Sequence, residues 1–279
     1  MFRQLRLDGV LLVLLLWFFA PVAGANSALT GSWYNPDRDG EGFHIEILPD
    51  QQALVIWFTY PGPNDDPEAE QAWILGTGSV TDNTISIIDA FRTHGPVFGP
   101  GYDQNDLVIE TWGNLTLTFS DNNNGVVDYS GSDGEGATEL SRITSLANQE
   151  DSGRFPVGMS GAWYNPDTNG QGWFMEVLSD ELALLYFFTY DKNGNQAWSL
   201  EAGYFDGNRV VVANTKSGKG TRFGDQFDQE KVQREAFVNI VMEYDGCDGG
   251  WARFETVDGA VSDDVPIVRS TSLSSAECK

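Results

Sequence analysis

Cysteine, histidine and basic residues are all scarce in this chain of 279 residues. The only cysteines are Cys247 and Cys278, and the only histidines are His44 and His94. A structural zinc site usually needs about four such ligands, so the histidines would need help from carboxylates. Lysine and arginine number 16, against 41 aspartates and glutamates. Because nucleic acids and anionic lipids require a cationic surface, we expect neither as a partner.

Long apolar runs are also missing, except near the N-terminus. Arg3 and Arg6 precede an apolar run at 10–20, and small residues follow at 23–25. A run of about eleven residues is shorter than the roughly 20 that a membrane-spanning helix needs. The pattern is typical of a secretory signal peptide. We predict that residues 1–25 are removed and that the protein is exported to the periplasm or the medium, with no membrane association after cleavage.

The two cysteines fit such a destination. Exported proteins meet an oxidising environment, which favours a disulfide between Cys247 and Cys278. The position equivalent to Cys247 in the first half of the chain is Asn122. Two free thiols are the alternative.

No convincing helical period is present, but the chain contains a repeat. Residues 31–43 read GSWYNPDRDGEGF and residues 161–173 read GAWYNPDTNGQGW, with eight of thirteen positions identical. The similarity extends to WFTY at 57–60 against FFTY at 187–190, and it resumes after a longer loop in the first copy. One structural unit therefore occurs twice. We expect repeat 1 at 26–147, a linker at 148–157 and repeat 2 at 158–279.

Short β-rich segments separated by Gly, Asn, Asp and Pro predict an all-β fold. In repeat 2 we expect eight strands, at 161–164, 172–178, 183–190, 196–205, 209–214, 237–244, 250–257 and 266–273. Eight antiparallel strands in about 120 residues suit an up-and-down barrel or a barrel-like sandwich. We favour two tandem eight-stranded antiparallel barrels. Strands that are apolar on both faces, such as 53–60, indicate that the barrels pack together.

The opening motif W-Y-N-P-x-x-x-G-x-G, the WFTY segment, a later Trp and a late Arg resemble a repeat domain of secreted proteobacterial proteins. No activity is established for that family, so the resemblance implies export and tandem architecture alone. Asp39 and Asn169 stand where the family usually has Ser, and Glu41 and Gln171 stand where it often has Trp.

A weaker similarity links each repeat to avidin and lipocalin barrels, which begin with G-x-W and, in lipocalins, end with an Arg. Trp33 and Trp163 occupy the Trp position, and Arg142 and Arg269 are the late arginines. We expect each indole to close one barrel end beneath a stacked guanidinium.

Aromatic and amide side chains recur at matching positions in both repeats. Flat rings with polar tips suit the faces and hydroxyl groups of sugars, although the same rings could simply fill the two cores. We predict a non-catalytic binding protein for a neutral carbohydrate or similar small molecule. The candidate ligand-binding residues are Tyr34, Asn35, Tyr60, Gln71 and Trp73, with their equivalents Tyr164, Asn165, Tyr190, Gln196 and Trp198.

Paired carboxylates offer a catalytic alternative. Glu46 and Glu176 recur inside apolar strands, and Asp103 and Asp228 form a second repeated pair. A glycosidase- or lyase-type enzyme could use one Glu and one Asp across a cavity. Alternation along the strand favours a simpler interpretation, in which both glutamates face solvent or pair with the late arginines. No nucleophile motif is duplicated, since the equivalents of the two histidines are Phe174 and Lys219.

Calcium is the remaining cofactor hypothesis. Residues 121–125 read DNNNG and are followed by Asp128, and a second acidic loop holds Asp37, Asp39 and Glu41. The first loop lacks the EF-hand spacing, and such sequences also form plain hairpin turns. We predict no resident cofactor, and keep a Ca²⁺-binding or envelope-interaction protein as a third alternative.

Overall fold

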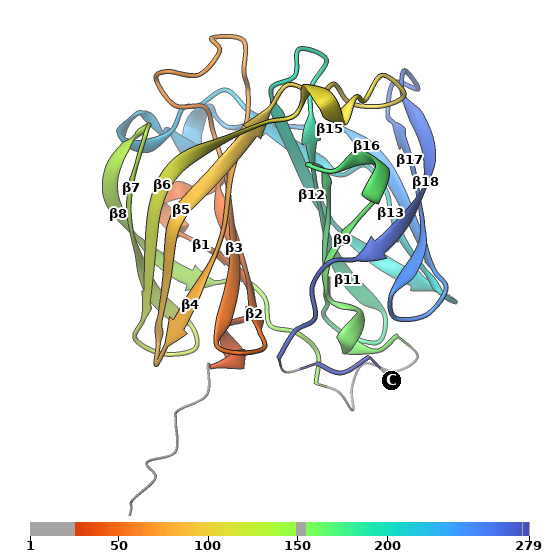
Figure 1. Ribbon diagram of the computed structural model, residues 1–279, viewed down its shortest axis with the longest axis horizontal. Helices are drawn as coiled ribbons and strands as arrows, with labels where there is room; N and C mark the ends of the chain where they lie inside the picture. The colour runs from red at the N-terminus through yellow and green to blue at the C-terminus, as the bar shows by residue number, and fades with distance from the viewer. Residues whose placement is uncertain (1–25, 149–154, 275, 279) are drawn as a thin grey trace, which may run out of the picture.

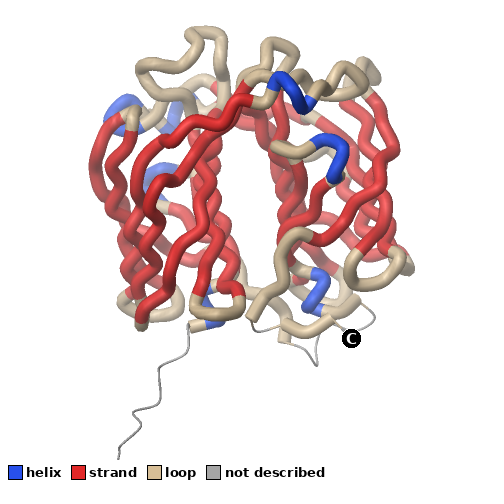
Figure 2. The backbone as a smooth tube through the Cα atoms, viewed as in Figure 1, coloured by secondary structure: helices blue, strands red, loops and turns tan. Residues whose placement is uncertain are grey.

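The protein folds into two closed antiparallel β-barrels that stand side by side (Figure 1). The computed structural model describes residues 26–148, 155–274 and 276–278. The predicted signal peptide and positions 149–154 of the predicted linker lie outside these ranges. Strands make up most of the described chain (Figure 2). The predicted all-β, double-barrel fold is confirmed.

Barrel 1 follows an up-and-down order and is closed by pairing of its first and last strands. Its strands are β1 (Gly31–Tyr34), β2 (Gly42–Leu48), β3 (Gln52–Thr59), β4 (Ala72–Thr81), β5 (Thr84–His94), β6 (Val108–Phe119), β7 (Asn124–Gly131) and β8 (Gly134–Arg142).

Barrel 2 repeats this order, but it is divided into ten strands, because the equivalents of β5 and β6 are each interrupted. Its strands are β9 (Gly161–Tyr164), β10 (Gly172–Val177), β11 (Leu182–Tyr190), β12 (Gln196–Asp206), β13 (Arg209–Val212), β14 (Lys216–Lys219), β15 (Gln233–Ala236), β16 (Val238–Tyr244), β17 (Gly249–Thr256) and β18 (Ser262–Arg269).

Short 3₁₀ turns connect several strands. They are η1 (Ser27–Leu29), η2 (Pro36–Arg38), η3 (Gln104–Asp106), η4 (Val157–Met159), η5 (Pro166–Thr168), η6 (Gly224–Gln226) and η7 (Gln229–Lys231). Among the described residues, no helix is long and apolar enough to cross a membrane.

Alternation along each strand places one apolar face inside its barrel. In β2, Phe43, Ile45 and Ile47 point into the barrel 1 core. The opposite face of β3 and β4 is also apolar, and it packs against the outer face of β10–β12. The predicted packing of one outer wall on the other is therefore observed. This third core contains Ile56, Phe58, Trp73, Phe174, Leu184, Tyr186, Phe188 and Trp198.

A bent arm leaves each barrel and crosses to the other (Figure 1). The repeat 1 arm is residues 91–111, and the repeat 2 arm is residues 216–236. Each arm begins after a residue with positive φ, Asp89 at 58° and its equivalent Asn214 at 55°. The side chains of Asn114 and Asn239 accept hydrogen bonds from the backbone N–H groups of Asp89 and Asn214 respectively. Asp and Asn tolerate the left-handed region better than other side chains, so the bend is built into both repeats.

Each arm inserts one phenylalanine into the other barrel. Phe223 of the repeat 2 arm is buried in the barrel 1 core, where its ring centroid lies 5.0 Å from that of Trp57. Phe98, its equivalent in repeat 1, packs in barrel 2 at 5.6 Å from Phe187 and 5.3 Å from Phe254. Each barrel is therefore plugged by the other repeat.

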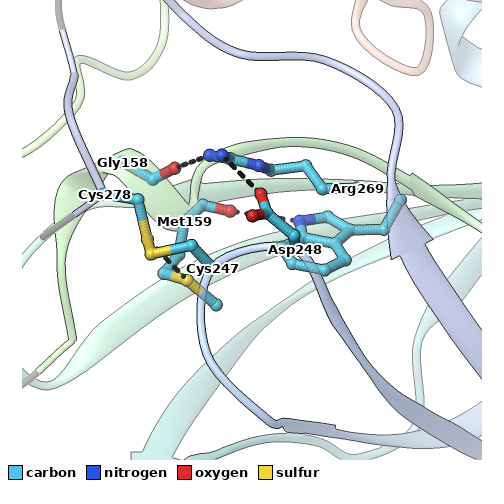
Figure 3. The surroundings of a disulfide bond; sticks show 7 residues. Gly158, Met159, Cys247, Asp248, Arg269 and Cys278 are labelled. Atoms are coloured by element: carbon cyan, nitrogen blue, oxygen red, sulfur yellow. Dashed lines mark hydrogen bonds and ion pairs between the residues drawn. A yellow bond between two sulfur atoms is a disulfide. The ribbon is translucent and has the colours of Figure 1, made fainter.

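The late arginines close the opposite barrel ends. The Arg142 guanidinium lies 4.2 Å from the centroid of the Trp33 ring, as expected. Arg269 pairs in register with Trp163, donates to Gly158 O at 2.5 Å and contacts the Asp248 carboxylate at 2.9 Å. The predicted disulfide between Cys247 and Cys278 is present beside this arginine (Figure 3). It ties the C-terminal segment to the β16–β17 turn.

Some predicted strand limits were wrong. β14 and β15 were not expected, because their sequences KSGK and QREA carry no apolar alternation. β18 begins at Ser262, not at 266, and ends at Arg269. Phe155, inside the predicted linker, is buried in barrel 2 and stacks on Phe205 with centroids 4.2 Å apart. A large ring in a polar segment was the missed signal.

Candidate functional site

The barrel interiors are filled by side chains. Trp33, Phe119 and Phe223 pack with the rest of the barrel 1 core, and Trp163, Trp173 and Phe187 pack in barrel 2. The resemblance to lipocalins would place a ligand inside a barrel. In this protein aromatic rings occupy that space, so the candidate site lies on the surface between the barrels.

A cleft of about 350 Å³ opens between the two barrels, beside their shared core. We call it the inter-barrel cleft. Aromatic and aliphatic side chains of both repeats line it, with several charged groups. They include Trp33, Tyr34, Asp39, Glu41, Phe58, Tyr60, Ile143, Leu184, Tyr186, Trp198, Leu200, Glu201, Ala202, Lys216 and Arg234.

A buried carboxyl group of the cleft is that of Glu41, whose equivalent in repeat 2 is Gln171. Glu41 is buried, accepts from the Thr59 hydroxyl at 2.6 Å and pairs with Arg38 at 2.5 Å. Burial raises the pKa of Glu41, although the positive charge of Arg38 and the Thr59 bond oppose that shift. The cleft therefore holds a carboxyl group that is easier to protonate than usual.

Tyr60 illustrates how the two sides of the molecule differ. Its hydroxyl donates to Gly40 O at 2.9 Å, and Tyr190 makes the equivalent bond to Gly170 O. Tyr190 also shares a hydrogen bond with Thr93, whereas Gly218 stands at the position equivalent to Thr93. A Cβ on Gly218 would lie 2.6 Å from the Tyr60 oxygen. Glycine on this side therefore leaves room around the Tyr60 hydroxyl.

Charged side chains surround the cleft opening. Arg234 pairs with Asp39 at 2.8 Å, and both remain about half exposed. Lys216 and Glu201 add one charge of each sign. With these four groups the opening is close to balanced, so its charge favours neither a strong anion nor a strong cation.

A buried ionic cluster lies next to the cleft, in the interface between the barrels. His44 Nδ1 is 2.9 Å from Glu176 Oε1, and His44 Nε2 is 3.3 Å from Glu46 Oε1. Ser32 and Thr144 donate to the Glu176 carboxylate, and Ser32 also shares a 2.6 Å hydrogen bond with Tyr186. Both glutamates have no exposed surface.

The pKa values in this cluster favour an ionised histidine. Burial alone would lower the pKa of His44, but hydrogen bonds and charge from Glu176 and Glu46 raise it to about 9. Burial opposes ionisation of Glu176, yet the bonds from His44, Ser32 and Thr144 hold its pKa below the usual value. The cluster therefore contains an imidazolium paired with the ionised Glu176. Glu46 Oε2 has no hydrogen-bond partner among the described residues.

The simpler interpretation of Glu46 and Glu176, exposure to solvent, was wrong. Both do point away from their own barrel core, as alternation indicates. The other barrel covers that face. The glutamate side chains therefore lie outside their own barrel but are buried in the interface between the two barrels. Sequence alternation identifies a face but not what packs on it.

The cluster does not have the arrangement of a hydrolytic triad. The Ser32 hydroxyl bonds to Glu176, whereas a nucleophile would bond to the histidine. His44, Ser32 and both glutamates are buried, with no more than 1 % of their surface exposed. The arrangement joins the barrels but gives a substrate no access.

The candidate acid partners lie elsewhere. Asp103 caps η3 by accepting from the Asn105 N–H, and Asp228 caps η7 by accepting from the Glu230 N–H. Asp228 also pairs with Lys231 at 3.0 Å, and Asp103 is exposed. Each proposed pair thus joins a glutamate in the dry interface to an aspartate on a surface turn. The structure gives the catalytic hypothesis no common cavity.

The duplicated glutamines join the barrels. Gln71 accepts from Trp198 N and donates to Trp198 O, while Gln196 makes the same two bonds with Trp73. These four bonds measure 2.8–3.0 Å. The structure therefore places Gln71, Trp73 and Gln196 in the interface, and Trp198 contributes to both the interface and the cleft wall.

The other predicted ligand residues divide between turns and the cleft. Asn35 and Asn165 cap η2 and η5 through the N–H groups of Asp37 and Asp167. Tyr164 is half-buried beside β18. Tyr34 and Tyr60 line the cleft, but Tyr190 lies on the opposite side of the pair. Three of the predicted residues, Tyr34, Tyr60 and Trp198, therefore meet at one site.

The predicted calcium loops form hairpin turns. Asp121 accepts from the backbone N–H groups of Asn123 and Asn124, and these bonds lower its pKa. Asp128 lies within β7, Asp37 lies within η2, and Asp39 follows η2 directly. Within the described residues, no group of three or more His, Cys, Asp or Glu side chains is arranged to hold a metal ion.

Several cleft residues were not singled out from the sequence. Tyr186, Lys216 and Arg234 lack like residues at their equivalents Ile56, Phe91 and Ile109. The search for repeated residues passed over them for that reason. A search for polar residues present in one repeat alone would have found them.

The sequence matches no protein-family model, and no curated protein resembles it significantly. Fold and site geometry are therefore the basis for assigning a function.

Proposed function

We propose that this protein is an exported, non-catalytic binding protein whose ligand occupies the inter-barrel cleft. The ligand class that fits best is a neutral carbohydrate. The observation that supports the proposal is the meeting of Tyr34, Tyr60 and Trp198 from both repeats in one cleft. Aromatic walls with a few convergent polar groups are typical of small-molecule sites.

The polar groups of the cleft suit hydroxyl groups. The Glu41 carboxyl can accept a hydrogen bond, and Arg234 and Lys216 can donate. Opposite charges at the opening offset each other, which disfavours a strongly charged ligand. A sugar presents hydroxyls to such groups and its C–H face to the rings.

Export is supported by independent features. The Cys247–Cys278 bond fits an oxidising destination. The basic, apolar and small residues at the start of the chain fit a signal peptide. The similarity of the opening motif to secreted proteobacterial repeats agrees with both, and we propose membership of that group.

Calorimetric titration of the purified protein tests the proposal. Cellohexaose, xylohexaose, laminarihexaose and chitohexaose serve as probes, and we expect at least one to bind. Tyr34→Ala should weaken that binding about tenfold by removing one ring contact of the order of 1.4 kcal/mol. The matched control is Tyr164→Ala, the equivalent half-buried tyrosine of repeat 2, which should leave the affinity unchanged.

A filling variant provides a second readout. Ala202 is exposed and lines the cleft, and its equivalent in barrel 1 is the exposed Thr77. Ala202→Trp should abolish binding of the oligosaccharide by occupying its space, and Thr77→Trp should not. If none of the four probes binds to folded protein, or if the two members of each pair behave alike, the proposal is wrong.

A further inference from the structure

The mouth of barrel 1 forms a second hollow, distinct from the cleft. It measures about 410 Å³, and its walls include Arg38, Trp57, Tyr129, Thr138, Glu139 and Asp225. We call it the barrel 1 mouth. Asp225 belongs to η6 of the repeat 2 arm, so the hollow is completed by the crossing of that arm.

The aromatic rings at this mouth differ from their equivalents in barrel 2. Phe223 packs beside Trp57, Trp112 and Tyr129 at centroid distances of 5.0, 5.9 and 5.6 Å. In barrel 2, Phe98 packs among Phe187, Phe237 and Phe254, which occupy the equivalent positions. Barrel 1 thus has two indoles and a phenol where barrel 2 has three phenyl rings. The fold does not need the polar atoms, because barrel 2 closes without them.

The donors at the mouth are not all used within the protein. The Trp112 indole N–H donates to Asp133 at 2.7 Å. Trp57 Nε1 is buried and has no hydrogen-bond partner within the part of the chain that the structure describes. An unpaired buried donor is unfavourable, and an oxygen of a bound ligand would supply the missing hydrogen bond.

An unpaired indole does not by itself mark a site. Trp173 of barrel 2 has an unpaired N–H as well, within the stacked pair that it forms with Phe187. The distinguishing feature of Trp57 is the hollow that it lines together with the half-buried Tyr129. Trp173 is therefore the natural control.

The charges at the mouth indicate what kind of ligand fits. Arg38 is already engaged by Glu41 and by Gly224 O, and its guanidinium lies 4.4 Å from the Phe227 ring centroid. Glu139 and Asp225 are exposed and can accept hydrogen bonds. Two donors on aromatic rings and two exposed carboxylates around one hollow suit a ligand that both accepts and donates, such as a hydroxylated ring.

We propose that the barrel 1 mouth binds one neutral sugar ring, with the Trp57 N–H and the Tyr129 hydroxyl donating to its oxygens and Glu139 and Asp225 accepting from its hydroxyls. The site goes beyond the cleft and does not depend on it. On a polymeric glycan, two sites on one rigid protein would raise the avidity without any new contact.

Nitrogen-15 NMR of the indole N–H groups tests the inference directly. The probes are glucose, galactose, mannose, xylose and N-acetylglucosamine, and the Trp57 resonance is assigned from its absence in Trp57→Phe. We expect at least one sugar to shift the Trp57 resonance while the Trp173 resonance stays in place. No shift of the Trp57 resonance with any of the five sugars, up to their solubility limits, would overturn the inference.

Matched variants separate binding from packing. Trp57→Phe and Tyr129→Phe introduce the residue type that barrel 2 already carries at these positions, so the fold should tolerate both. Each should weaken sugar binding about tenfold, as expected for one lost hydrogen bond, whereas Trp173→Phe should have no effect. Equal effects of Trp57→Phe and Trp173→Phe would contradict the inference.

The cleft variant keeps this test separate from the proposed function. Ala202→Trp fills the inter-barrel cleft and should leave the Trp57 shift intact. If Ala202→Trp removes the shift, the sugar binds in the cleft and the mouth is not a site. A different outcome is that a sugar shifts the Trp57 resonance while Ala202→Trp leaves hexasaccharide binding unchanged. The proposed function then fails and this inference stands.

Discussion

The two barrels share a topology but divide the polar chemistry unequally. At the interface, barrel 1 supplies Ser32 and His44, where barrel 2 has Ala162 and Phe174. At the cleft, Glu41 has Gln171 as its equivalent. Barrel 2 in turn supplies Tyr186, Lys216 and Arg234, where barrel 1 has Ile56, Phe91 and Ile109. Each copy thus carries polar groups that the other lacks. The comparison shows that duplication can preserve a framework while the two halves specialise in different ways.

Removal of the interface cation should have the largest effect. In His44→Phe, barrel 1 takes the barrel 2 residue, and two buried carboxylates lose their shared partner. Breaking a buried ion pair from one side typically costs about 3–5 kcal/mol. Chemical denaturation monitored by tryptophan fluorescence should show such a loss of stability.

The triple variant with Glu46→Leu and Glu176→Leu added is the control for this effect. Replacing a buried ionic group by apolar residues is often neutral or stabilising. We expect the triple variant to recover most of the lost stability. A loss below about 1 kcal/mol in His44→Phe would show that the cluster is not an ionised bridge.

The same cluster predicts how stability depends on pH. The pKa of His44 is raised from 6.5 to about 9, so its contribution is complete below pH 6.5 and is lost as the pH rises through about 9. The pKa of Glu176 is lowered from 4.5, so its contribution is present above that pH and is lost in acid. Stability from this cluster should be greatest between these limits. Melting temperatures from pH 4 to 10 check this, and His44→Phe should lose the alkaline decline.

Replacement of the exchanged phenylalanines should have the next-largest effect on stability. Phe→Ala in a core typically costs about 3–5 kcal/mol. Phe223 is 4 % exposed in barrel 1, while Phe98 is half-buried in barrel 2. We expect Phe223→Ala to lie near the lower end of that range and Phe98→Ala to cost less. Equal losses in urea unfolding would mean that both plugs contribute alike.

The disulfide has no counterpart in repeat 1 and should contribute less. It closes a loop between Cys247 and Cys278, whose sequence separation is 31. The chain-entropy estimate for such a loop is about 3 kcal/mol, and measured values are often smaller. The C-terminal segment also touches barrel 1, where the Ser274 N–H donates to Ile47 O at 2.9 Å. We expect the double variant Cys247→Ala/Cys278→Ala to melt at a lower temperature, with NMR changes in barrel 1 confined to the residues beside that segment. Altered signals throughout barrel 1 would show that the disulfide supports both barrels.

The smallest effect is expected at Glu41. Its raised pKa means that ionisation in the folded state is costly, so the destabilising effect grows as the pH rises above 4.5. Glu41→Gln introduces the barrel 2 residue and removes this penalty, together with the ion pair to Arg38. The burial penalty and the lost ion pair offset each other, so we expect stability at neutral pH to change by less than about 1 kcal/mol. The difference between variant and wild type should vanish at low pH, which acid titration of the melting temperature can measure.

Local sequence patterns predicted the repeat, the barrels and the disulfide. They succeeded because hairpin turns and alternating strands are encoded by neighbouring residues, and because the chain has only two cysteines to pair. The strands that are apolar on both faces even predicted the contact between barrels. The polar arm strands β14 and β15 were missed, since they pair with each other along the arm and their residues carry no apolar alternation.

The site could be predicted in part. Tyr34, Tyr60 and Trp198 were found because they recur in both repeats. Glu46 was placed in solvent because alternation refers to one barrel and says nothing of the second. His44 was treated as an isolated residue, since its partner Glu176 lies in the other repeat. Contacts between repeats are the information that a single sequence does not display.

The crossed arms also determine what a single repeat could do. If the two repeats were separated, each barrel would lack the phenylalanine that fills its end, and each arm would lack a barrel to insert into. Two such halves could satisfy each other by a two-fold arrangement in which each gives and receives one phenylalanine. The present chain has the form of that dimer with its subunits covalently joined. Its halves can therefore diverge in sequence and still remain paired.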